Sequence, residues 1–196
     1  MAATIIFDLG GVLVNLDWDK VCAPLTELSP QTYDEVATEI QNGPIVESSM
    51  LGHLTPQEFQ ETLCAKIQVN IGFDQFIGIW NRLLSEDETM ASYVGELGLS
   101  HRLILASNTD AIHIAYSMKN FKVLGEFERL FLSNEMGLLK PDPDYFQHIL
   151  GELQIDPVEC IFIDDRFENV LSARSLGING LVFESVEKLK DLSEIL

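Results

Sequence analysis

The chain opens with a short apolar run, Ile5-Ile6-Phe7, which stops at Asp8 and is followed by the pair Gly10-Gly11. A run this short, rich in β-branched residues and bounded by glycine, predicts a buried strand that leads into a tight loop. After residue 100, similar apolar runs alternate with segments of helical spacing. Strands are predicted at about 103–106, 130–132, 160–163 and 180–183, and helices at about 88–98, 109–119, 145–150, 166–176 and 185–193. This alternation indicates an α/β fold, a parallel sheet with helices on both faces.

Residues 18–85 show helical spacing and no convincing strand. Thr55-Pro56-Gln57-Glu58 has the pattern of a capping box with proline at the first helical position, and it predicts a helix start. Ser29-Pro30 is interpreted in the same way. We expect three or four short antiparallel helices here. The predicted core domain, residues 1–15 and 89–196, therefore carries a small helical-bundle cap, residues 16–88, as an insertion.

Charge limits the classes of partner. Acidic residues outnumber basic ones by 31 to 12 among 196 residues, a formal net charge of −19. Such a field repels a phosphate backbone, so we expect no nucleic-acid partner. It also repels a small anion unless a cation lies in the binding site.

Three further features bear on location. No uncharged run approaches the roughly 20 residues of a membrane span, and the N-terminus lacks the basic segment of a signal peptide. Cys22, Cys64 and Cys160 lie far apart in apolar or amphipathic stretches, which is typical of free thiols in a reducing cytosol. We therefore expect a cytoplasmic protein without a membrane partner. The sequence carries no signal for an oligomeric state.

Polar residues follow several of the predicted strands. Asp8, Ser107 and the pair Asp164-Asp165 each come directly after a strand, and Lys140 precedes a helix after another strand. Each alone has an ordinary interpretation: a turn for Asp8 or Ser107, a solvated surface for Lys140, a helix cap for the acidic pair. Together they are expected at one edge of the sheet, where open α/β folds bind ligands.

The residue types suggest a reaction. Three crowded carboxylates repel one another unless a hard cation binds, and Mg²⁺ prefers oxygen ligands and phosphate. Lys140 adds positive charge, and Ser107 with the following backbone N–H groups can donate to phosphate oxygens. Asp8 is then placed for nucleophilic attack and an aspartyl-phosphate. Receiver domains use a similar set of residues, but there the acidic pair comes first, whereas here it comes last.

Four segments carry a resemblance to a known family: Phe7-Asp8-Leu9-Gly10-Gly11-Val12, Leu105-Ala106-Ser107-Asn108-Thr109, Gly137-Leu138-Leu139-Lys140-Pro141-Asp142-Pro143 and Phe162-Ile163-Asp164-Asp165. In order and spacing they resemble the four motifs of the haloacid dehalogenase (HAD) superfamily, which has a Rossmann-like core. The cap interval matches the position of the family's helical cap. The closest-looking subgroup contains α-glucose-1-phosphate phosphatases and the phosphatase-like domain of epoxide hydrolases.

The resemblance implies a role for each matched position. Asp8 would be the nucleophile. The Mg²⁺ ligands would be Asp8, the backbone carbonyl of Gly10, Asp165 and, directly or through water, Asp164. Ser107 and Asn108 would hold the phosphoryl group, Lys140 would neutralise Asp8 and the phosphate, and Asn169 would orient the acidic loop.

One position departs from the family pattern. HAD phosphatases usually carry a second aspartate two residues after the nucleophile, as the acid that protonates the leaving group, and here that position is Gly10. A general acid typically contributes about 10²–10⁴ in rate, so weak activity is expected unless Asp17 or Asp19 replaces it.

The expected function is a Mg²⁺-dependent phosphatase of small, sugar-phosphate-like metabolites. The alternatives are a non-catalytic protein that binds a phosphorylated ligand or a partner and, with less support, a 2-haloacid dehalogenase or a phosphomutase. The cap would set the substrate, and its candidate lining residues are Trp18, His53, Trp80 and Arg82.

Overall fold

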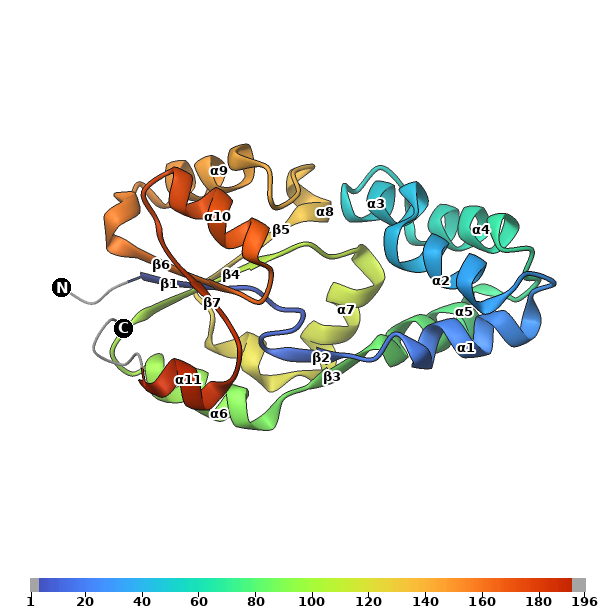
Figure 1. Ribbon diagram of the computed structural model, residues 1–196, viewed down its shortest axis with the longest axis horizontal. Coiled ribbons are helices and arrows are strands. Elements are labelled where there is room, and N and C mark those ends of the chain that lie inside the picture. Colours follow the sequence, from blue (N-terminus) through green and yellow to red (C-terminus); the bar gives the residue numbers. More distant parts are fainter. Residues whose placement is uncertain (1–3, 192–196) are drawn as a thin grey trace.

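The computed structural model describes residues 4–191. Five parallel strands form the main sheet in the order β5-β4-β1-β6-β7 (Figure 1). Their bounds are β1 Thr4–Phe7, β4 Arg102–Ser107, β5 Arg129–Leu132, β6 Cys160–Asp164 and β7 Asn179–Val182. In the centre of the sheet, Ile6 is paired with Ile104 on one side and Phe162 on the other. The predicted parallel sheet is confirmed, with strand limits within two residues of those expected.

Successive side chains of the strands enter two separate apolar layers, as the period of two requires. Ile6, Ile104 and Phe162 pack in one cluster with residues of α9 (Pro143–Leu153) and α10 (Phe167–Ser175). Ile5 and Phe7 belong to the other cluster, with residues of α6 (Glu88–Leu97), α7 (Ala111–Asn120) and α11 (Val186–Asp191). Figure 1 shows α9 and α10 above the sheet and α6 and α11 below it. Helices on both faces are therefore confirmed.

The interval between β1 and α6 contains five helices, which lie beyond the end of the sheet (Figure 1). They are α1 Asp19–Leu28, α2 Tyr33–Asn42, α3 Pro44–Met50, α4 Pro56–Lys66 and α5 Phe73–Trp80. The capping box at Thr55 and Glu58 is present and starts α4. The start at Ser29-Pro30 is wrong, because Ser29 is the C-cap of α1 and its hydroxyl donates to the carbonyl of Ile67 at 2.5 Å. The helix starts at Tyr33 instead, from a capping box of Thr32 and Glu35.

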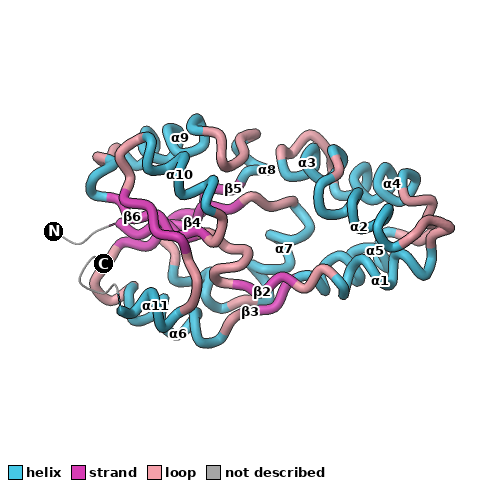
Figure 2. The backbone as a smooth tube through the Cα atoms, viewed as in Figure 1, coloured by secondary structure: helices cyan, strands magenta, loops and turns pink. Residues whose placement is uncertain are grey.

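The structure contains two short strands near the ends of this interval that the sequence did not predict. β2 (Val14–Leu16) pairs antiparallel with β3 (Leu84–Glu86), Leu16 opposite Leu84, and the pair forms a separate two-stranded sheet. Figure 2 shows this ribbon between the main sheet and the five helices. Strands of three residues carry too little periodicity to be recognised, and their pairing joins segments about 70 residues apart. The helix number was too low because α3 is a separate seven-residue helix. The division into core 1–15 and 89–196 and cap 16–88 stays a prediction.

The remaining differences are small. The sequence analysis missed the four-residue helix α8 (Ser133–Met136) and the 3-10 turns η1 (Asn81–Leu83), η2 (Lys122–Glu126) and η3 (Pro157–Glu159). The last two residues of the helix expected at 185–193 lie outside the described residues. The three cysteines are free and buried, as expected. Within residues 4–191, no helix is both long and apolar enough to cross a membrane.

Candidate active site

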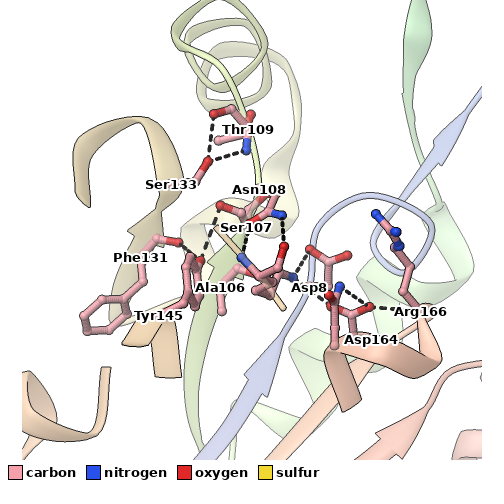
Figure 3. A network of polar contacts seen from close by, with 12 residues as sticks. Asp8, Ala106, Ser107, Asn108, Thr109, Phe131, Ser133, Tyr145, Asp164 and Arg166 are labelled. Atoms are coloured by element: carbon pink, nitrogen blue, oxygen red, sulfur yellow. Dashed lines mark hydrogen bonds and ion pairs between the residues drawn. The ribbon is translucent and has the colours of Figure 1, made fainter. Parts of the chain in front are cut away.

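Three of the predicted site residues meet at the carboxyl edge of the central strands. Asp8 follows β1, Ser107 ends β4 and Asp164 ends β6, and these three strands are neighbours. The Asp8 N–H donates to the carbonyl of Ile163 at 2.9 Å, which fixes the start of the first loop against β6. Figure 3 shows the side chains of Asp8, Ser107 and Asp164 close together at this edge.

The ammonium group of Lys140 lies at the centre of the site, and its side chain is only 1% exposed. Nζ lies 2.8 Å from Asp8 Oδ1 and 2.7 Å from Asp164 Oδ2. It also donates to the carbonyl of Ala106 at 2.8 Å. An ammonium group has three protons, so each has a protein acceptor. Lys140 is therefore a buried cation that holds two carboxylates, and the ordinary interpretation as a solvated surface lysine is wrong.

Asp164 is completely buried and receives several donors. The Asn169 side-chain amide lies 3.0 Å from both of its oxygens, and the backbone N–H of Arg166 donates to Oδ1 at 2.8 Å. With Lys140 as well, both oxygens of this carboxylate are occupied by protein donors. Asp164 therefore holds Lys140 and the acidic loop in place. Asn169 thus contacts Asp164, and its role in orienting the acidic loop stays a prediction.

Asp8 and Asp165 are left with fewer donors. Burial raises the pKa of Asp8, the charge of Lys140 opposes that effect and the charge of Asp164 adds to it, with a result of about 6. Burial and the charge of Asp164 also raise the pKa of Asp165. Both shifts have the same physical origin, because negative charge is concentrated where little water reaches.

The donor set fits a divalent cation. Asp8, Asp164 and Asp165 each offer a carboxylate oxygen, and these oxygens lie within 4.8 Å of one another. Three negative charges face the single positive charge of Lys140, an excess of two, while the guanidinium of Arg166 pairs with Glu168. Oxygen ligands with excess negative charge are what Mg²⁺ requires.

Gly11 brings the first loop close to this cluster. Its φ is +77°, and a Cβ at this position would lie 2.4 Å from Asp165 Oδ2. Both the left-handed conformation and the contact therefore require glycine. The preceding residue, Gly10, lines the same cavity as Asp8 and Asp165. Its carbonyl stays a predicted metal ligand.

The loop after β4 is held by side chains that sequence analysis did not connect. The Asn108 amide donates to the carbonyl of Lys140 at 2.8 Å and accepts from its N–H at 2.9 Å. Buried Ser133 accepts from the N–H of Thr109 at 2.9 Å and donates to its carbonyl at 3.1 Å. The Asn108 side chain therefore holds the Lys140 peptide, and the role of Asn108 in holding a phosphoryl group stays a prediction. Its backbone N–H and the Ser107 hydroxyl remain as candidate donors (Figure 3).

A cavity of about 220 Å³ lies over these residues, between the sheet edge and the helices of the predicted cap. Asp8, Gly10, Ser107, Asn108, Lys140 and Asp165 line it, together with Trp18 and Trp80 from the predicted cap. His53 and Arg82 do not contribute to its wall. Asp17 pairs with Lys20, and Asp19 accepts from Tyr33. Neither acid lines the cavity, so they do not replace the acid missing at Gly10.

The cavity also includes a buried network that sequence analysis missed. His113 Nδ1 lies 3.0 Å from Asp110 Oδ2, and Nε2 lies 3.0 Å from the carbonyl of Trp80. The Trp80 indole N–H donates to the same carboxylate at 3.0 Å, and the Trp80 and His113 rings are stacked with centroids 5.0 Å apart. Since both ring nitrogens face acceptors, His113 is an imidazolium ion. This network joins α5 to α7. The local signal was Asp110 as an N-cap before a helical pattern.

A model of the haloacid dehalogenase-like hydrolase family matches residues 2–177. The chain belongs to the HAD-like hydrolases. The family resemblance found in the sequence is thereby confirmed, while the narrower subgroup stays a prediction.

Two relatives that match this HAD-like hydrolase over most of its length are named phosphatases. It is 26% identical over 184 residues to D-ribitol-5-phosphate phosphatase of Bacteroides thetaiotaomicron, covering 90% of this chain and 89% of that protein. It is 28% identical over 182 residues to a sesquiterpene phosphatase of Aspergillus oryzae, covering 90% and 87%. A solved HAD family enzyme of B. thetaiotaomicron, in complex with magnesium and inorganic phosphate, matches with a TM-score of 0.86 and 29% identity, covering 96% and 99%.

Proposed function

We propose that this HAD-like hydrolase is a Mg²⁺-dependent phosphatase of small phosphorylated molecules, with Asp8 as the nucleophile. One observation carries the proposal: Asp8 lines the cavity at the sheet edge, 2.8 Å from the buried ammonium of Lys140 and within the cluster of three carboxylates. A carboxylate fixed beside a cation and a metal site is arranged for attack on a bound phosphoryl group.

Each residue of the site would have a separate role. Asp8, the carbonyl of Gly10 and Asp165 would hold Mg²⁺, with Asp164 contributing directly or through water. The ion, when bound, would neutralise phosphate charge. Ser107 and the N–H of Asn108 would bind the phosphoryl oxygens. Lys140 keeps Asp8 oriented, because Asp164 and the carbonyl of Ala106 fix the position of its ammonium group.

The relatives support this proposal and differ in substrate. One is named for D-ribitol 5-phosphate, a polyol phosphate, and the other for sesquiterpenes, so they share the phosphatase activity and not the body of the substrate. The solved enzyme with magnesium and inorganic phosphate supports the metal and the ligand class.

Phosphate release from 4-nitrophenyl phosphate tests the proposal. We expect turnover with Mg²⁺, loss of turnover with EDTA and recovery when Mg²⁺ is restored. Asp8→Asn should abolish turnover, whereas the control Asp34→Asn, on the exposed surface of α2, should not change it. An unchanged rate in Asp8→Asn would refute the mechanism. Stabilisation by phosphate and Mg²⁺ without any turnover would favour the non-catalytic alternative.

A further inference from the structure

The cavity over Asp8 contains no group that is free to protonate a leaving oxygen. Its titratable residues are Asp8, Asp110, His113, Lys140, Asp165 and Arg166 among the residues that the structure describes. Asp8 is the proposed nucleophile, and Asp165 belongs to the carboxylate cluster that would hold the metal. The other four are Asp110, His113, Lys140 and Arg166.

Lys140 and His113 have protons, but protein acceptors hold all of them. The three protons of Lys140 are directed to Asp8, Asp164 and the carbonyl of Ala106. The two ring protons of His113 are directed to Asp110 and the carbonyl of Trp80. Asp110 accepts from Trp80 and from two backbone N–H groups of α7, as expected of an ionised carboxylate. The fourth, Arg166, carries a guanidinium, which does not release a proton in proteins.

An apolar side chain occupies the space beside the nucleophile loop. A Cβ added to Gly10 would lie 3.3 Å from Leu16 Cδ1, so the absence of a side chain at residue 10 leaves room for Leu16. Leu16 lines the cavity and is 37% exposed, so its apolar side chain is accessible to a ligand. The cavity wall beside Gly10 is therefore aliphatic.

The same character extends over the cap side of the cavity. That wall consists mainly of Leu16, Trp18, Met50, Trp80, Leu83 and Leu84. Among the described residues of the predicted cap that line this wall, Gln41 is the only polar one apart from the two tryptophans. A polyol placed here would leave most of its hydroxyl groups without partners, and such groups are costly to bury.

We infer that the substrate is a phosphate whose leaving oxygen departs as a stable anion, an aryl or acyl phosphate, attached to an apolar body. This inference rests on the proposed phosphatase function and narrows its substrate. It differs from the sugar-phosphate expectation, because the cavity offers no free proton for an alkoxide and its cap-side wall, with Gln41 as its polar exception, offers few partners for sugar hydroxyls.

The reaction balances without a protein acid. Asp8 attacks phosphorus, the bond from phosphorus to the leaving oxygen breaks, and the bonding electron pair leaves with that oxygen, which needs no proton before it departs. Water then attacks phosphorus, the bond to Asp8 breaks with its electron pair returning to the carboxylate, and the proton of the water passes to solvent. The products are inorganic phosphate and a phenolate or carboxylate.

Two compounds of matched shape test the leaving group. Phenyl phosphate releases an oxygen comparable to the tyrosine phenol, whose pKa is about 10, whereas cyclohexyl phosphate releases an alkoxide far closer in basicity to hydroxide. We expect kcat/KM to be at least about 10²-fold higher for phenyl phosphate, the lower limit of what a general acid contributes. Equal rates would show that the site contains a proton donor and would overturn the inference. Benzoyl phosphate, an acyl phosphate, is compared with phenyl phosphate, an aryl phosphate. The compound with the higher kcat/KM identifies which of the two classes the site prefers.

A variant tests the same point from the protein side. Gly10→Asp introduces a carboxyl group beside the leaving oxygen, and the neighbouring Leu16 tip is flexible enough to move. It should raise kcat/KM for cyclohexyl phosphate by about 10²-fold and so reduce the ratio of kcat/KM between phenyl phosphate and cyclohexyl phosphate. The double variant Gly10→Asp/Leu16→Ala removes the crowding, and an unchanged ratio in both properly folded variants would contradict the inference.

Two alkyl phosphates with similar leaving oxygens test the apolar body. Hexyl phosphate should be preferred over D-ribitol 5-phosphate by about 10²-fold in kcat/KM, the scale on which one pocket discriminates. Met50→Gln should reduce this preference, whereas the control Met118→Gln, 56% exposed on α7, should not. Preference for the polyol would overturn the inference. Hydrolysis of every compound at similar rates would refute only the inference, whereas hydrolysis of none with Mg²⁺ present would refute the proposed function.

Discussion

The buried ion pair of His113 and Asp110 predicts how the stability of this protein depends on pH. Burial by itself would lower the pKa of His113, but the charge of Asp110 and hydrogen bonds to Asp110 and Trp80 raise it above 6.5. Burial by itself would raise the pKa of Asp110, but the charge and hydrogen bonds of His113 and the indole of Trp80 lower it below 3.8. Both directions describe the same ion pair, imidazolium with carboxylate.

The sign of the dependence follows from these shifts. A group whose pKa is raised in the folded state stabilises that state fully below its unfolded value, here 6.5, and this contribution is lost as pH rises through the folded pKa. The lowered pKa of Asp110 contributes stability above 3.8, which is lost as pH falls. The pair therefore stabilises the fold most between these two values.

His113→Gln is the perturbation that tests this reasoning. Removing one partner of a buried ion pair costs about 3–5 kcal/mol, and 1 kcal/mol lowers Tm by about 2–4 °C in a domain of this size. We therefore expect Tm to fall by about 6–20 °C at pH 5.5, and the difference from the wild type to shrink as pH rises above 6.5.

Urea unfolding from pH 5 to pH 10 measures the free energy of unfolding of both proteins at each pH. The exposed residue His53 supplies the control, because His53→Gln should change stability by no more than about 0.5 kcal/mol at any pH. If the difference between wild type and His113→Gln is constant with pH, or grows at high pH, His113 is neutral in the folded protein and the ion-pair reasoning is refuted.

Three further predictions concern the loops of the site. Gly11→Ala should destabilise the fold by about 1–3 kcal/mol, because φ is +77° and the new Cβ would displace Asp165. The same displacement should weaken Mg²⁺ binding, which calorimetry measures. The matched control Gly95→Ala, inside α6 with open space around it, should stabilise the fold by about 0.4–1 kcal/mol. Asn108→Ala removes the two hydrogen bonds that the Asn108 side chain makes to the Lys140 backbone, so the free energy of unfolding in urea should fall by about 1–3 kcal/mol. The kcat of the phosphatase reaction should fall as well, and a kcat equal to that of the wild type would contradict this prediction. Lys140→Met leaves Asp8 and Asp164 buried without their cation, so phosphatase turnover should be lost and the free energy of unfolding should fall by about 3–5 kcal/mol. Added Mg²⁺ should recover part of this stability.

The sequence determined the sheet and much of the site for a local reason. A parallel strand is a short apolar run, and the polar residue that ends it is adjacent in the chain, so local pattern alone assigned Asp8, Ser107 and Asp164 to one edge of the sheet. Lys140 could be included because it follows the same order of elements. The motif order then sufficed for the family, which the match over residues 2–177 confirms.

Only the tertiary structure decided what surrounds these residues. The pairing of β2 with β3, the contact of Leu16 with Gly10 and the ion pair between His113 and Asp110 with its bond to Trp80 join segments that carry no mutual signal in the sequence. Whether a proton on Lys140 or His113 is free depends on distances to acceptors in other elements. Local pattern thus specifies which chemical groups reach the edge of the sheet, whereas long-range packing specifies which of their protons and surfaces remain for a substrate.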